Sequence, residues 1–299
     1  MKKIQILLGF LLSVMTLLKP GHAQTKQPQS TPPNVVLIFM DDMGYGDPEV
    51  YGGFPYHTPN INKLAASGMR FTNFYAAQAV CSASRAALLT GCYPNRVGIS
   101  GALMPWSTVA LNPQEETIAS IVKTKGYATG MIGKWHLGAK APYLPPSYGF
   151  DEYLGLPYSN DMWPVGYDGK PITDTADKKS KYPTLQLLDG FNPVMPINTL
   201  EDQAKLTTLY TERAVKFIGN NKNKPFFLYL AYTLPHAELV VPNTAMHSYL
   251  TQDGASKFAP EKAHPAGRAL RVRRRPSLPG APQARPHRQL APAYPRRPS

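Results

Sequence analysis

A continuous apolar run from Val35 to Met40, which leads directly into two aspartates, restricts the folding of this chain more than any other segment. Apolar runs without polar alternation are typical of parallel strands covered on both faces, so we expect a central strand here. A second run extends from Phe226 to Tyr232. Helical and shorter strand patterns alternate between the two runs. This alternation predicts an α/β fold with a mostly parallel sheet and helices on both faces.

Capping residues and periodicity place the elements between these runs. Thr58, Pro59 and Gly68 suit the N-cap, first residue and end of one helix. No element is predicted within residues 142–198, which are rich in Pro, Gly and Tyr. The other predicted elements are helices at 82–90, 116–125 and 200–218, and strands at 69–75 and 127–132.

The N-terminal residues have the pattern of an export signal. Lys2 and Lys3 precede a mostly apolar run, and Gly21-His22-Ala23 offers small residues at a cleavage site. We therefore predict a signal peptide over 1–23 and a polar linker over 24–33. The apolar run is short and interrupted for a membrane anchor, and no second run is long enough to span a bilayer. The sequence thus predicts an exported protein, periplasmic or secreted, without a membrane span after signal cleavage.

The formal net charge of +13 is concentrated at the two ends of the chain. Nine arginines in residues 268–299 and three lysines in residues 1–19 account for twelve of these charges. The body of the chain is nearly neutral, which argues against nucleic-acid binding. Residues 263–299 are rich in Arg and Pro and contain no acid. They are either a disordered basic tail or, as we favour, an unnatural continuation of the domain such as an out-of-frame translation.

Asp41 and Asp42 leave the first predicted strand together. Adjacent carboxylates behind a buried strand repel each other and lose solvation, so a hard divalent cation beside them would be stabilising. The alternative is a helix cap next to a solvated acid.

A second cluster, Cys81-Ser82-Ala83-Ser84-Arg85, begins the helix predicted at 82–90. Cys81 would lie at the positive end of that helix, where a developing negative charge is stabilised. Arg85, one turn later, can face the same site. The alternatives are a buried thiol, or a disulfide to Cys92 in an oxidising compartment.

Further cations and imidazoles follow two of the predicted strands. Lys134 and His136 share one face of an extended segment while Trp135 points the other way, which suits an anionic substrate and proton transfer. His236 comes shortly after the strand predicted at 226–232 and by itself would be read as a structural histidine.

Taken together, these clusters resemble the sulfatase family of the alkaline-phosphatase-like fold, most closely the arylsulfatase A type. The residues C-S-A-S-R-A-A-L-L-T-G, which start at Cys81, match the family's first signature motif. The residues G-Y-A-T-G-M-I-G-K-W-H, which start at Gly126, match the second. The resemblance covers about residues 34–262, which it identifies as the N-terminal part of a sulfatase catalytic domain. Ala83 stands where many members of the family have Pro.

The resemblance implies a nucleophile and a metal. Cys81 would be oxidised to formylglycine by a dedicated maturation enzyme, and the hydrate of this aldehyde would attack the substrate. Asp41, Asp42 and the modified Cys81 would ligate Ca²⁺, and Arg85 would hold the hydrate.

The resemblance also implies which residues handle the sulfate ester. Lys134 and His236 would bind the sulfate, and His236 would protonate the leaving alcohol oxygen. His136 would take a proton from the second hydroxyl of the hydrate, which expels sulfate. Ser159 would contact the substrate.

Two further Ca²⁺ ligands of the family, an Asp-Asn pair, and a later lysine have no counterpart downstream of His236. Asp253 stands in a turn-like sequence, and no acid follows Glu261. Because Ca²⁺ takes six to eight oxygens, we expect this chain taken alone to be incomplete and weakly active or inactive. The alternatives are a formylglycine-dependent hydrolase of phosphonate or phosphate esters, and a non-catalytic secreted fragment that binds polyanions.

Overall fold

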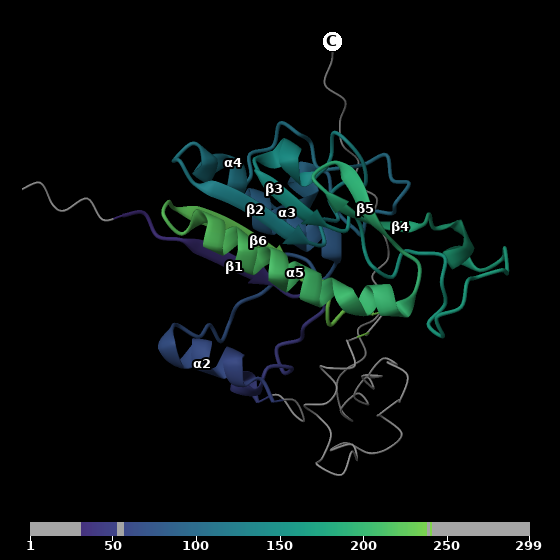
Figure 1. The fold of residues 1–299 in the computed structure, drawn as a ribbon, viewed down its shortest axis with the longest axis horizontal. Helices are drawn as coiled ribbons and strands as arrows, with labels where there is room; N and C mark the ends of the chain where they lie inside the picture. Colours follow the sequence, from purple (N-terminus) through teal and green to yellow (C-terminus); the bar gives the residue numbers. More distant parts are fainter. Residues whose placement is uncertain (1–30, 53–56, 238–239, 241–299) are drawn as a thin grey trace, which may run out of the picture.

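The structure, a computed structural model, describes residues 31–52, 57–237 and 240. Six strands form one sheet in the order β1-β6-β2-β3-β4-β5 (Figure 1). The first four strands in this order are parallel, whereas β4 and β5 are antiparallel neighbours beyond β3. The strands are β1 Val35–Phe39, β2 Ala128–Gly133, β3 Glu152–Gly155, β4 Leu185–Asp189, β5 Asn192–Ile197 and β6 Phe226–Ala231.

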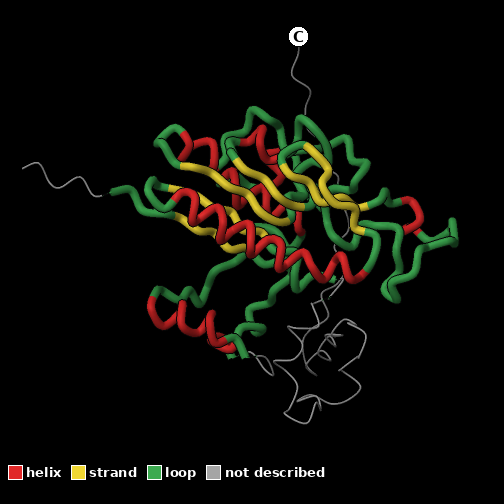
Figure 2. The backbone as a smooth tube through the Cα atoms, in the orientation of Figure 1, coloured by secondary structure: helices red, strands yellow, loops and turns green. Residues whose placement is uncertain are grey.

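Helices cover both faces of the sheet (Figures 1 and 2). Helix α5 packs on one face through Tyr210 and Phe217, and α3 and α4 pack on the other face through small and aliphatic side chains. Helix α2 lies apart from the sheet and buries none of its side chains. The predicted α/β fold with helices on both faces is confirmed. The α-helices are α2 Pro59–Ser67, α3 Cys81–Thr90, α4 Ile118–Lys123 and α5 Leu200–Asn221.

Two glycines allow the central strands to approach closely where they end. Gly133 has a φ of 111°, and a Cβ there would lie 1.9 Å from the carbonyl oxygen of Ala231 on β6. A Cβ at Gly155 would lie 1.8 Å from the carbonyl oxygen of Gly133. Because both distances are far below van der Waals contact, only glycine fits at these two positions.

The prediction of a central first strand is wrong for the described sheet. Strand β1 forms its edge, and the side chains of Val35, Val36 and Ile38 are 39%, 44% and 52% exposed. A continuous apolar run reports local hydrophobicity and contains no information on how many neighbours the strand has. The strand predicted at 69–75 is also wrong, because these residues form no strand and Met69 is 80% exposed.

The remaining element predictions are confirmed with small shifts of their ends, except that α4 is shorter than the helix predicted over 116–125. Thr117 closes a capping box with Ser120 and therefore starts α4 later than expected. Residues 142–198, for which no element was predicted, contain β3, β4 and β5.

Several predictions lie outside the described residues. These are the signal peptide over 1–23, the greater part of the linker over 24–33, Asp253 and the tail over 263–299. Among the residues that the structure describes, no helix is long and apolar enough to cross a membrane.

Candidate active site

The carboxyl ends of the four parallel strands bring most of the predicted site residues together. Asp41 follows β1, Lys134 follows β2, Ser159 follows β3 and His236 follows β6. The carboxyl edge of a parallel sheet is where ligands collect in open α/β folds. Cys81 reaches this edge from the first residue of α3.

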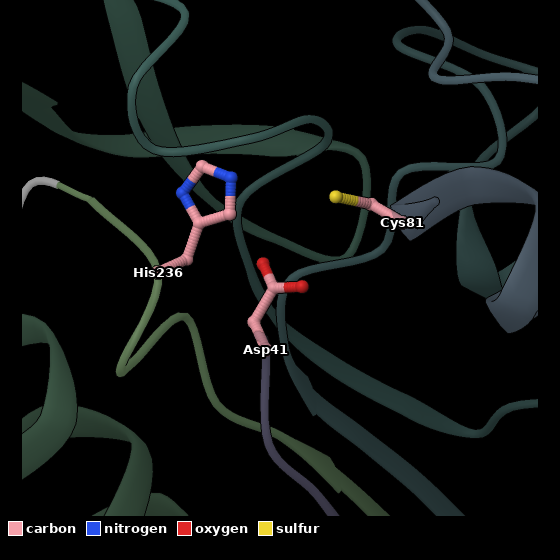
Figure 3. Close-up of side chains that lie close together, drawn as sticks. All are labelled: Asp41, Cys81 and His236. Carbon is pink, nitrogen blue, oxygen red and sulfur yellow. The ribbon is translucent and has the colours of Figure 1, made fainter. Parts of the chain in front are cut away.

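Asp41, Cys81 and His236 form the centre of the site, and Figure 3 shows their side chains pointing toward one another. One ligand atom of each lies within 4.8 Å of the others. Cys81 is half-buried and is a free thiol, as is Cys92, so the alternative of a disulfide is not realised. Its place at the N-terminus of α3 exposes it to the positive end of the helix dipole.

Two buried cations flank the carboxylate of Asp41. Lys134 Nζ lies 2.5 Å from one carboxylate oxygen, and Arg85 Nη2 lies 3.3 Å from the other. Both cations are fully buried, and Asp41 is 4% exposed. Burial alone would raise the pKa of Asp41, but Arg85 and Lys134 together lower it to about 2. The three ionised groups carry a net positive charge, so an anion that enters beside them is stabilised.

The two cations are held in fixed positions by neutral partners. Arg85 donates to the carbonyl oxygen of Lys134 at 2.7 Å, and its guanidinium lies 5.3 Å from the ring centroid of Phe39. Lys134 Nζ also donates to Ser159 Oγ at 2.8 Å. Ser159, which was predicted to contact the substrate, is 1% exposed, and its hydroxyl fixes the orientation of Lys134.

His236 has the properties of a proton donor. Its Nδ1 donates to the carbonyl oxygen of Ala237, which can only accept, and its Nε2 lies 3.5 Å from a carboxylate oxygen of Asp42. Burial alone would lower the pKa of His236, but its hydrogen bond with Cys81 and the charge of Asp41 raise it to about 9. With Cys81 as a thiol, these contacts favour the protonated ring.

Asp42 lies at the margin of this site. Its side chain is 63% exposed and contacts His236, whereas the carboxylate of the preceding Asp41 is buried. Its backbone has a φ of 61°, in the left-handed region that few non-glycine residues adopt. This strained turn separates the two adjacent carboxylates, one into the site and one toward solvent.

His136 is a neutral imidazole with one unpartnered nitrogen among the described residues. The ring is 1% exposed, and burial together with the charge of Lys134 holds its pKa well below the usual value. Its Nε2 lies 2.8 Å from the carbonyl oxygen of Leu103, so Nε2 carries the proton of the neutral ring. Its Nδ1 is buried and has no partner among the described residues. That nitrogen can accept a proton.

The argument that placed His136 on one face with Lys134 is only partly right. The backbone leaves the extended conformation at His136, where φ is 62°, so the side chain is directed by this turn and not by strand alternation. Trp135 does pack into the core, against Tyr148 and Phe150.

Sequence analysis missed two residues that shape the site. Leu103 accepts from His136 through its carbonyl oxygen and donates its N–H to Ser82 Oγ at 3.0 Å. Backbone groups in a loop have no sequence signature. Tyr229 lies on β6 and its hydroxyl accepts from Arg85 at 3.4 Å; the only signal was a polar atom within an otherwise apolar strand.

The described residues satisfy part of what Ca²⁺ requires. Asp41 is ionised and each of its oxygens keeps a free lone pair, but the thiol of Cys81 and the imidazole of His236 are poor ligands for a hard cation. Conversion of Cys81 to formylglycine would replace the sulfur by an oxygen, which is a suitable donor for Ca²⁺. The donor set therefore fits Ca²⁺ only with that modification, and it falls short of six oxygens among the described residues.

Comparison with known proteins identifies the family. The profile of the Sulfatase family matches residues 33–273. The chain is 37% identical to N-acetylgalactosamine-6-sulfatase of Sus scrofa over 234 residues, which covers 75% of this chain and 43% of that protein. It is 52% identical to arylsulfatase A of Homo sapiens over 136 residues, which covers 44% of this chain and 27% of that protein.

Solved structures agree with this assignment. The PsFucS1 sulfatase from Pseudoalteromonas sp. superimposes with a TM-score of 0.66 at 33% identity, over 74% of this chain and 47% of that one. Ps i-CgsB gives a TM-score of 0.60 at 34% identity, over 72% and 48%. The chain thus spans less than half the length of these relatives. Because the family profile covers most of its residues, the resemblance inferred from the two signature motifs is confirmed, and the chain belongs to the sulfatase family.

Proposed function

We propose that this site hydrolyses sulfate esters with a nucleophile derived from Cys81. The observation that carries the proposal is the placement of this thiol beside one carboxylate and two fully buried cations. A sulfate monoester is an anion, and negative charge moves to its leaving oxygen during hydrolysis. Fixed cations in a water-poor site stabilise such a charge without having to reorganise.

Formylglycine at position 81 would supply a hydrated aldehyde oxygen as the nucleophile. The residues C-S-A-S-R are the basis for expecting a maturation enzyme as a partner, and the thiol of Cys81 is free to be modified because it forms no disulfide. Export through the signal predicted over 1–23 belongs to the same proposal. Arg85, which contacts Asp41 from the next turn of α3, would hold the modified side chain.

The side chains around Cys81 have separate roles in binding the sulfate and in transferring protons. Lys134, oriented by Ser159, binds a sulfate oxygen together with His236. His236 donates the proton on Nε2 to the leaving alcohol oxygen, since its Nδ1 is engaged with the carbonyl oxygen of Ala237. His136 takes a proton at Nδ1, which is unprotonated and unpartnered among the described residues.

A bound Ca²⁺, held by Asp41, Asp42 and the oxygen at position 81, would supply further positive charge. Asp42 must turn inward to join it, since it is 63% exposed here. Because these groups provide fewer than six oxygens, we expect the 299-residue chain alone to turn over sulfate esters slowly. Assays of this chain and of one continued with the C-terminal half of a relative, each with added Ca²⁺, test this shortage. Equal rates would refute it.

The relatives indicate the substrate class. One solved relative, Ps i-CgsB, is 33% identical to this chain and was crystallised with k-i-k-neocarrahexaose, and a curated relative is an N-acetylgalactosamine-6-sulfatase. We therefore propose that this chain acts on sulfated sugars.

The proposal is tested on the chain continued with the C-terminal half of a relative, by comparing the hydrolysis of 4-nitrophenyl sulfate and 4-nitrophenyl phosphate after co-expression with a formylglycine-forming enzyme. We expect turnover of the sulfate ester, and its loss in Cys81→Ala. Cys92→Ala is the matched control, since it removes the other free thiol, beyond the opposite end of α3. Faster turnover of the phosphate ester would favour the phosphate-hydrolase alternative. The polyanion-binding alternative would be favoured if the chain turned over neither ester but was retained on heparin, and if deleting residues 263–299 abolished that retention.

A further inference from the structure

A small hollow beside His136 lies next to the ion cluster. Its other walls include Leu103, Met104, Ser107, Val109, Pro157 and Tyr158. The loop that forms one wall is fastened to the active site at both ends. Leu103 is bonded to Ser82 and His136, and Leu111 donates to the carbonyl oxygen of Leu137 at 2.8 Å. The loop therefore has a fixed position relative to the reacting groups.

Trp106 lies in a tight turn of this loop, in which Ser107 donates its N–H to the carbonyl oxygen of Met104 at 2.9 Å. Its side chain is 56% exposed, whereas Trp135 and Trp163 are fully buried. The indole stacks on the ring of Tyr182 with 5.4 Å between centroids and 23° between planes. One face of the indole is thus supported, and a large part of its surface remains in water, on the loop whose Met104 and Ser107 line the hollow.

Polar groups adjoin this aromatic pair. Asp161 is close enough to Tyr182 that its charge adds to the effect of burial in raising the pKa of the phenol. One carboxylate oxygen of Asp161 is buried and has no partner among the described residues. Asp161 lies in the same loop as Ser159, which orients Lys134.

An aromatic plane beside a carboxylate suits a sugar ring. The C–H face of a pyranose is apolar and packs on an aromatic ring, while its hydroxyl groups donate hydrogen bonds to a carboxylate. An aryl group would use the aromatic plane and leave the carboxylate without a donor. The combination of the two therefore favours a sugar over an aryl group.

We infer that Trp106, supported by Tyr182, binds the apolar face of the sugar whose sulfate ester enters the site. This inference rests on the proposed function and adds the residue that recognises the organic part of the substrate. Trp106 is then a specificity residue, since the sulfate is held by Lys134 and His236 and not by the indole.

Intrinsic fluorescence can test this inference without turnover. Of the three tryptophans in the chain only Trp106 is exposed, so iodide quenches its emission selectively. The probes are galactose-6-sulfate, inorganic sulfate and 4-nitrophenyl sulfate, each with affinity measured by calorimetry. The variants are Trp106→Ala and Trp106→Phe. Tyr93→Ala is the matched control, because Tyr93 is an 82% exposed aromatic beyond the far end of α3.

Galactose-6-sulfate is expected to protect Trp106 from iodide, and inorganic sulfate is not. Trp106→Ala should weaken binding of galactose-6-sulfate roughly tenfold, in line with the loss of one aromatic contact, and change the affinity for sulfate less than about twofold. Trp106→Phe should retain part of the sugar affinity. Unchanged galactose-6-sulfate affinity in Trp106→Ala, or a loss confined to 4-nitrophenyl sulfate, would overturn the inference. Failure of the wild-type chain to bind sulfate in any form would instead overturn the proposed function as well.

Discussion

Replacing Asp41 by Asn is expected to destabilise the fold far more than replacing Lys134 by Met. Asp41 is 4% exposed and contacts two cations that are fully buried. In Asp41→Asn both cations stay buried without this countercharge. In Lys134→Met the neutral pair of Asp41 and Arg85 remains, with 3.3 Å between its charged atoms.

The magnitudes follow from these contacts. Removing one partner of a buried ion pair costs about 3–5 kcal/mol, because the other charge is left uncompensated, and we expect this range for Asp41→Asn. Replacing the surplus cation by an apolar side chain of similar length should cost about 1 kcal/mol or less. The double variant should be more stable than Asp41→Asn alone, since it leaves one buried cation in place of two.

Urea unfolding at neutral pH, followed by circular dichroism, measures all three free energies of unfolding. Calorimetry with inorganic sulfate provides the functional readout, in which Lys134→Met should fold well and bind sulfate weakly. The reasoning is refuted if Asp41→Asn unfolds at the urea concentration of the wild-type chain. The reasoning is equally refuted if the free energy of unfolding of the double variant falls by the sum of the losses in the two single variants.

Three further results are expected. Gly133→Ala should lose roughly 3 kcal/mol or more in urea unfolding, because its Cβ would lie 1.9 Å from the Ala231 carbonyl oxygen at a φ of 111°. Gly46→Ala, where no atom lies within 4 Å, should be nearly neutral, and similar losses in both would contradict this reasoning. Asp151 has a pKa lowered below 3.8, because its hydrogen bonds and ion pair outweigh burial. The ionised carboxylate of Asp151 should therefore stabilise the fold above about pH 3.8, and this stabilisation should be lost as the pH falls through the lowered pKa. An acid-unfolding midpoint that is unchanged in Asp151→Asn would argue against this role. In a fully active form, His236→Ala should slow hydrolysis about 10²–10⁴-fold for alkyl sulfates and less for acidic phenol leaving groups; equal losses across that series would mean that His236 only binds sulfate.

The site was more predictable from sequence than the sheet around it. Cys81 and Arg85 are four residues apart on one helix, so helical geometry alone placed them together. Asp41, Lys134 and His236 each follow a strand of the parallel part of the sheet, and parallel strands end at a common edge. Periodicity and this one topological rule predicted a common edge of the sheet, whereas the assignment of these residues to one site, His236 above all, came from the resemblance to the sulfatase family.

Contacts between distant segments could not be predicted in the same way. The ion pair of Asp41 with Lys134 joins residues that are 93 positions apart, and no spacing rule connects them. The bonding of His136 depends on a carbonyl oxygen in a loop and on a turn with positive φ. Such contacts arise from packing, which a local pattern does not contain.

The missed hairpin of β4 and β5 has a different explanation. Its turn at Asp189-Gly190 carried a hairpin signal, but Pro193 and Pro196 in β5 argued against a strand. Proline is tolerated there because β5 is the edge strand of the described sheet, where a missing N–H interrupts no ladder on its outer side. Edge position also explains why the apolar run of β1 is partly exposed.

The mass of the peptide that contains Cys81 tests the central claim most directly. After co-expression with a formylglycine-forming enzyme, the account predicts that this peptide is lighter by the difference between a thiol group and an aldehyde. The peptide should then react with a hydrazide probe, and the peptide that contains Cys92 should not. An unmodified thiol at Cys81, in cells where a known substrate of the same maturation enzyme is converted, would contradict the account.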